Sequence, residues 1–175
     1  MMLFSSESVT FETPIAMLTA CHDRVRQYAA LTHKLALHLR KNGADAKAQE
    51  AAASILRYFD IAAPLHHDDE DLDLFPLLSQ HGQPELQAII AATSAEHATL
   101  GLLWQEVRRY LVPLAASKGG ALPLALAEDF ANLYSAHAQL EETAIYPYAA
   151  QLLDAATLAT MGQKMANRRM QGTKK

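Results

Sequence analysis

The sequence contains a single cysteine, Cys21, so it cannot form an internal disulfide. It lacks any apolar run of the roughly 18 to 20 residues that a membrane-spanning helix needs, and its first residues lack the basic segment of a signal peptide. Positive charge is not in excess, since 15 lysines and arginines accompany 19 aspartates and glutamates, with a pI near 6.0. These absences predict a cytoplasmic protein with neither nucleic acid nor a membrane as partner.

Glycine and proline are sparse, at seven each among 175 residues, whereas half of the residues are apolar. Such a composition favours helices over short strands. We predict an all-α fold in which residues 1–175 form one domain: an antiparallel up-down-up-down four-helix bundle over about 14–150 and a short C-terminal fifth helix. Turn residues and apolar spacing place the helices at about 14–41, 46–78 with a kink at Pro64, 84–116, 122–147 and 154–170.

Two segments of the chain repeat one another. His66 precedes Glu70 by four residues, and in the second segment His137 precedes its glutamate by the same spacing. In both segments an aromatic residue and a proline begin five residues after the glutamate. Residues four apart on a helix lie on the same face. Each segment therefore directs one imidazole and one carboxylate at the same point, which is typical of a metal site.

Each repeat also has a histidine upstream, on the preceding predicted helix. The first lies 44 residues before His66, and the second lies 40 residues before His137. A bundle that packs the two halves together gathers four imidazoles and two carboxylates in one core, where they would be poorly compensated without a cation. The predicted metal ligands are His22, His66, Glu70, His97, His137 and Glu141.

Six such ligands exceed the three or four that a single zinc ion takes. They suit two ions, each bound by two histidines with both glutamates bridging, and the mixture of nitrogen and oxygen favours iron ahead of manganese or zinc. With a shared oxo or hydroxo ligand each iron has five ligands, which leaves about one open position on an octahedral ion. A diatomic molecule or a peroxide is the expected ligand there.

These motifs resemble the hemerythrin-like HHE cation-binding domain family. The resemblance covers roughly residues 14–150 and is strongest in His66-His67-Asp68-Asp69-Glu70 with Phe75-Pro76, and in His137 and Glu141-Glu142 with Tyr146-Pro147. It implies a four-helix bundle with a non-haem di-iron centre on the same six side chains. Members of the family bind oxygen, sense oxygen or iron, or handle nitric oxide and peroxide.

The chain departs from the oxygen-carrying hemerythrins at two positions. Those proteins have an additional histidine one turn before the third-helix histidine, where this chain has Thr93. Their last carboxylate is an aspartate five residues after its histidine, whereas Glu141 lies four residues after His137. The resemblance therefore implies a more symmetric site with an open position on both irons, closer to the bacterial members than to the respiratory carriers.

His67 and Asp71 form a competing pair four residues apart, turned by about 100° around the helix. Alignment of the two repeats places His66, not His67, opposite His137. We therefore predict that His67 lies at the rim of the site or contacts the ligands from outside. A solvated acidic face is predicted for four residues: Asp68, Asp69, Asp71 and Asp73.

Three further residues are expected near the ligands. Thr93 and Gly101 lie four residues before and after His97, and their small size is expected to leave a pocket for a small ligand. Tyr134 lies one turn before His137 and is expected to donate a hydrogen bond beside the site.

The sequence thus predicts a non-haem di-iron protein that binds or reacts with dioxygen, nitric oxide or peroxide, for sensing, storage or redox protection. One alternative is an enzyme that consumes peroxide, or that repairs or supplies iron to damaged iron centres. Another is an iron- or oxygen-responsive regulatory binding module. No nucleophile, cofactor fingerprint or output domain selects among them, and the sequence identifies no protein partner.

Overall fold

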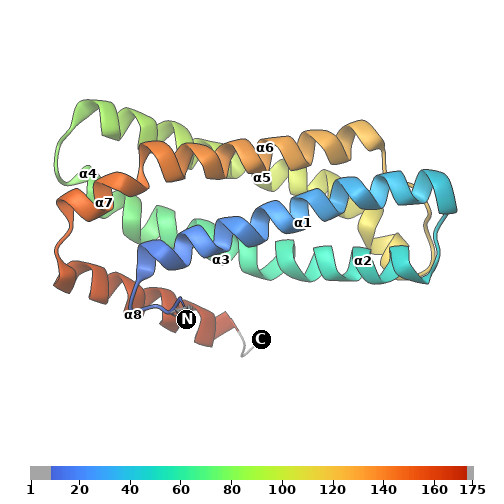
Figure 1. The fold of residues 1–175 in the computed structure, drawn as a ribbon, viewed down its shortest axis with the longest axis horizontal. Helices are drawn as coiled ribbons and strands as arrows, with labels where there is room; N and C mark the ends of the chain where they lie inside the picture. The colour runs from blue at the N-terminus through green and yellow to red at the C-terminus, as the bar shows by residue number, and fades with distance from the viewer. Residues whose placement is uncertain (1–8, 173–175) are drawn as a thin grey trace, which may run out of the picture.

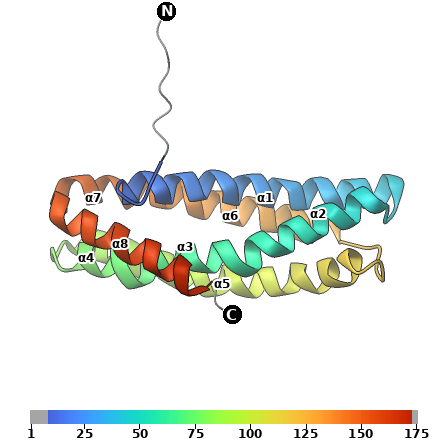
Figure 2. The same cartoon turned by 90° about the horizontal axis from the view of Figure 1, so that it is seen from below.

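The computed structural model describes residues 9–172, and this part of the chain is helical apart from short connections and contains no strand. Four antiparallel rods form a bundle (Figure 1), and a shorter helix crosses it (Figure 2). The all-α bundle prediction is confirmed. The rods are α1 (Pro14–Asn42); α2 (Ala46–Arg57), α3 (Ala63–Asp69) and α4 (Phe75–Ser79) in line; α5 (Pro84–Ala115); and α6 (Leu124–Ala144) followed by α7 (Tyr146–Leu152). The crossing helix is α8 (Ala155–Gly172).

Two π-helical turns join the three helices of the second rod: η1 (Tyr58–Ala62) and η2 (Glu70–Leu74). Each turn ends two residues before a proline, Pro64 or Pro76. Proline has no N–H and its ring collides with the carbonyl four residues earlier in an α-helix, and a wider turn accommodates it. The kink predicted at Pro64 is therefore a π-helical turn, and the second such turn begins at a predicted ligand.

Two apolar clusters fill the bundle on either side of the predicted ligands. One contains the aromatic side chains of Phe59, Trp104 and Phe130, which pack in tilted and edge-to-face contacts, and the other contains Leu74, Phe75 and Ile145. On α1, His22 lies between a member of each cluster, Leu18 and Val25. Burial of each large apolar side chain stabilises the fold by about 1.5–3 kcal/mol, so the packing that holds the rods together also positions the polar layer between them.

Helix α8 packs diagonally across the second rod (Figure 2). Arg168 donates hydrogen bonds to Asp69 and, at 2.7 Å, to Asp73, and Arg169 donates to Asp69 at 2.6 Å. Both aspartates are buried. The prediction of a solvated acidic face is wrong for these two residues, because the C-terminal helix supplies cationic partners from about 95 residues away in the sequence.

The single-domain prediction spans residues 1–175, of which 1–8 and 173–175 lie outside the described residues. Within the described part of the chain, no helix is both long enough and apolar enough to cross a membrane.

Candidate metal centre

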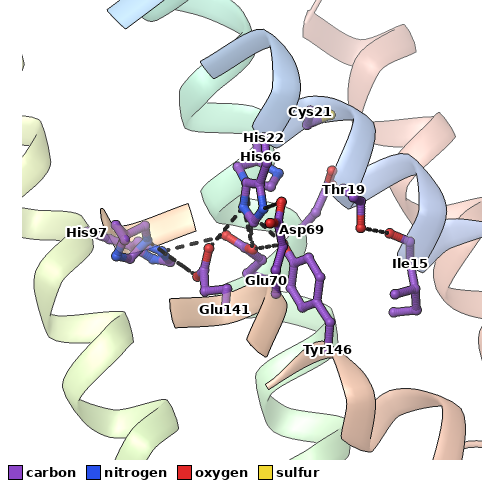
Figure 3. Close-up of polar contacts among 12 residues, drawn as sticks. Ile15, Thr19, Cys21, His22, His66, Asp69, Glu70, His97, Glu141 and Tyr146 are labelled. Atoms are coloured by element: carbon purple, nitrogen blue, oxygen red, sulfur yellow. Dashed lines mark hydrogen bonds and ion pairs between the residues drawn. The ribbon is translucent and has the colours of Figure 1, made fainter. Parts of the chain in front are cut away.

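The structure brings all six predicted ligands together between the rods, and Figure 3 shows His22, His66, Glu70, His97 and Glu141 there. They come from α1, α3, η2, α5 and α6, and each is buried, with at most 8% of its surface exposed. Figure 3 shows the carboxylates of Glu70 and Glu141 between His97 on one side and His22 and His66 on the other. The polar layer is therefore one buried cluster with two histidine-lined halves.

Glu141 connects the two halves through its two oxygens. Its Oε2 lies 3.0 Å from His22 Nε2. Its Oε1 lies 3.5 Å from His97 Nε2 and 3.3 Å from His137 Nε2. One carboxylate thus directs an oxygen into each half.

Glu70 spans the cluster in the same manner. Its Oε1 lies 3.6 Å from His66 Nε2 and 3.9 Å from His22 Nε2. Its Oε2 lies 3.6 Å from His97 Nε2. Both glutamates therefore direct an oxygen into each half of the cluster, and the i,i+4 spacing inferred from the sequence places each one beside its own histidine.

The outer nitrogens of three histidines contact carboxylates outside the cluster. Nδ1 of His22 lies 3.0 Å from Glu142, Nδ1 of His97 lies 2.8 Å from Asp71, and Nδ1 of His137 lies 2.9 Å from Glu96. A carboxylate at Nδ1 holds the proton there and leaves Nε2 as an electron-pair donor facing inward. The three imidazoles are oriented as metal ligands.

Sequence reasoning missed these three carboxylates. Asp71 was assigned to the solvated acidic face, but it accepts hydrogen bonds from His97 and, at 2.7 Å, from Ser94 on α5. Glu96 and Glu142 each adjoin a predicted ligand in the sequence, but the histidines they contact are 41 and 120 residues away. No local pattern connects residues across such separations, so only the packing of the rods reveals them.

Tyr146 also belongs to the centre, although in the sequence it served only to align the repeats. Its hydroxyl donates a hydrogen bond of 2.5 Å to Glu70 Oε1 and lies 3.2 Å from His22 Nε2. Burial, together with Glu70 and Glu141, raises the pKa of the Tyr146 phenol well above its usual range. The phenol therefore retains its proton at neutral pH, at the edge of the half formed by His22 and His66.

The other residues expected near the ligands have different positions. His67 is half-buried and its ring stacks on His97, with centroids 4.0 Å apart. Tyr134 donates to the backbone carbonyl of Leu100 at 3.3 Å, not to a ligand. Thr93 is fully buried, and its hydroxyl has no hydrogen-bond partner among the described residues. Gly101 is exposed on α5, and no described atom outside the adjacent helix backbone lies within 4 Å of the place its Cβ would occupy; the small-ligand pocket between Thr93 and Gly101 stays a prediction.

The charges of the cluster are poorly compensated by the protein alone. Burial and the neighbouring Glu141 raise the pKa of Glu70 well above its usual range. Burial also lowers the pKa of His66 well below its usual range, with contributions from nearby imidazoles. Several buried polar atoms in the described cluster have no hydrogen-bond partner, namely His66 Nδ1, His97 Nε2, His137 Nε2, Glu70 Oε2 and both carboxylate oxygens of Glu141. Buried polar groups are rarely unpaired, and a bound cation would satisfy those that face the centre.

Comparison with known proteins agrees with this geometry. An uncharacterized protein of Haemophilus influenzae (strain ATCC 51907 / DSM 11121 / KW20 / Rd) is 34% identical over 160 residues, which span 91% of this chain and 92% of the relative. The family model of the hemerythrin HHE cation binding domain matches residues 13–149, which include every residue of the cluster. The chain is therefore a metal-binding protein of the hemerythrin HHE cation-binding domain family.

Proposed function

We propose that the chain is a non-haem di-iron protein that binds or reacts with a small oxidant, namely dioxygen, nitric oxide or peroxide, for sensing, storage or redox protection. The observation that supports it best is the position of the two buried glutamates. Each directs one oxygen toward His22 or His66 and the other toward the histidines of the opposite half. Two carboxylates so placed suit two cations that share both bridges.

The ligand set favours iron. A structural zinc ion takes four ligands in a closed tetrahedron. The two halves of this cluster together offer four imidazoles and two carboxylates, which exceed the needs of one such ion and suit two irons. Two irons at such a site would supply redox chemistry and open positions for a diatomic molecule or a peroxide. The protein's own part is to orient the ligands, limit water and hold a proton nearby.

Two features of the surroundings help to limit water and to hold a proton near the centre. The rings of Phe59, Trp104 and Phe130 pack with centroids 4.8–5.9 Å apart on one side of the ligands, where they exclude water. A cleft of about 390 Å³ between α5 and α6 reaches His137 and is lined in part by Glu96. A small molecule could approach the centre along this cleft, while the Tyr146 hydroxyl holds a proton on the opposite half.

Metal analysis combined with absorption spectroscopy tests the proposal. Protein isolated in air is expected to contain about two irons per chain and to show near-ultraviolet charge-transfer bands. These bands should change when anaerobically reduced protein is exposed to oxygen, nitric oxide or peroxide. A reversible change supports a carrier or sensor, and steady consumption of peroxide or nitric oxide supports an enzyme. Colourless protein that retains only zinc would contradict the proposal.

The carboxylate behind His97 provides a further prediction. An Asp71→Ala substitution removes the group that orients His97, and the affinity for iron is expected to fall about 10–100-fold. Competition with a chelator measures this loss. Asp68→Ala is the matched control, because Asp68 lies three residues away on the same rod and is exposed. Equal affinities for the two variants would show that Asp71 does not support the site.

A regulatory role is the second candidate function, and the contact between α8 and the second rod favours it. Asp69, which is bound by Arg168 and Arg169, directly precedes Glu70. A change in metal loading that moved Glu70 would therefore act on the docking of α8. Exchange of backbone amides in α8 that differs between metal-loaded and metal-free protein would support this role, and identical exchange would exclude it.

A further inference from the structure

His67 occupies a position that the duplicated sequence motif does not explain. It follows His66 on α3 and is therefore turned by about 100° around the helix, toward the other half of the cluster. Its ring stacks on His97 at 4.0 Å with planes 9° apart, and it meets His137 edge-on at 5.8 Å. One potential ligand atom from each of these three histidines lies within 4.8 Å of the other two. Imidazole nitrogens from three different helices thus lie close to one another.

The atoms around that place lack hydrogen-bond partners within the described chain. His97 and His137 use their Nδ1 atoms for Asp71 and Glu96, and their Nε2 atoms are buried and unpaired. The glutamate oxygens that face this half, Glu70 Oε2 and Glu141 Oε1, are buried and unpaired as well. His67 therefore lies beside four nitrogen and oxygen atoms that have no hydrogen-bond partner and are of the kinds that bind a metal ion.

The opposite half has a different neighbour. There, the Tyr146 hydroxyl lies 3.2 Å from His22 Nε2 and donates to Glu70 Oε1. The remaining potential ligands of that half, His66 and one oxygen of each glutamate, lie with His22 in a second group of four. The two halves are thus unequal: three imidazoles lie on one side, and two imidazoles with a phenol lie on the other.

We infer that His67 is a fifth histidine ligand of the ion held by His97 and His137, and that its ring tilts out of the stack on binding so that its in-plane lone pair points at that ion. This inference rests on the proposed di-iron function. The ion in that half then has three nitrogens and two carboxylate oxygens, whereas the ion bound by His22 and His66 has two nitrogens and two carboxylate oxygens. The two ions of the centre then differ in their number of nitrogen ligands.

Substitution of His67 by phenylalanine separates metal binding from packing. Phenylalanine retains a ring that stacks on His97 and removes both nitrogens. The His67→Phe protein is titrated anaerobically with ferrous iron in competition with a chelator. Its affinity for one of the two irons is expected to fall by more than about 100-fold, because the loss of a group that only orients a ligand lowers affinity by roughly 10–100-fold. The metal-free forms of His67→Phe and the unmodified protein are expected to unfold within about 2 °C of one another, because the ring volume and stacking are kept.

Two further variants complete the experiment. His67→Ala should lose the same iron as His67→Phe, and His81→Phe, at an exposed histidine, should lose none. If His67→Phe binds both irons normally, the histidine acts only through packing or not at all, and the inference is overturned. If the unmodified protein does not bind two irons, the proposed function fails together with the inference. Two irons in the unmodified protein with both bound normally by His67→Phe would overturn the inference alone.

Discussion

A Glu141→Gln substitution is expected to abolish binding of both metal ions and the thermal stabilisation that they provide. Glu141 lies 3.0 Å from His22 and within 3.5 Å of His97 and His137, so the loss of one anionic oxygen from each half weakens both sites. A ligand present at about 1,000 times its dissociation constant stabilises the native state by roughly 4 kcal/mol. For a chain of this size the difference corresponds to a change in Tm on the order of 10 °C for each ion.

Differential scanning calorimetry of metal-loaded and chelator-treated protein measures this effect. The control is Glu128→Gln, an exposed glutamate on the same helix, which should keep both the iron content and the full metal-dependent rise in Tm. A Glu141→Gln protein that still contained two irons per chain would show that Glu141 is not a metal ligand. It would also contradict the bridging arrangement on which the proposed function depends.

An Arg168→Ala substitution is expected to cause the largest loss of stability outside the centre. Arg168 binds Asp69 and Asp73, which are 0% and 3% exposed, and its removal leaves both carboxylates short of a partner in a dry environment. Breaking a buried ion pair in this way costs about 3–5 kcal/mol. Because Arg169 still contacts Asp69, we expect the lower end, about 3 kcal/mol, or a fall in Tm of about 6–12 °C.

The same interactions explain why removing one charged partner lowers the free energy of unfolding by more than the intact ion pair adds to it. Burial raises the pKa of Asp69 even though Arg168 and Arg169 oppose this shift, so desolvation outweighs their attraction. Urea denaturation of the metal-free variants at neutral pH tests the prediction. Lys164→Ala is the control, because Lys164 also contacts Asp73, at 3.3 Å, but is 60% exposed and should contribute at most about 1 kcal/mol. Equal losses for the two variants would contradict a buried ion-pair network between α8 and the second rod.

The acidic segment of the second rod shows where prediction from the sequence stops. Asp68, Asp69 and Asp71 have the same side chain within four positions, and one solvated face was predicted for all of them. In the structure Asp68 is exposed and Asp69 is bound by arginines of α8. Asp71 contacts the imidazole of His97, which lies on α5. Successive residues turn by about 100° around a helix, so each meets a different neighbour. The neighbours themselves come from distant parts of the chain.

The positions of the helices and the two His-x-x-x-Glu units were determined by the sequence alone, because both depend on local geometry. Proline and glycine set helix ends within a few residues, and a spacing of four aligns two side chains whatever the surroundings. The convergence of the two units, the carboxylates behind the imidazoles, the Tyr146 hydroxyl and the stacking of His67 on His97 were decided only by the tertiary structure. These contacts join residues on different rods, and their distances depend on how apolar packing fixes the rotation and register of one rod against another.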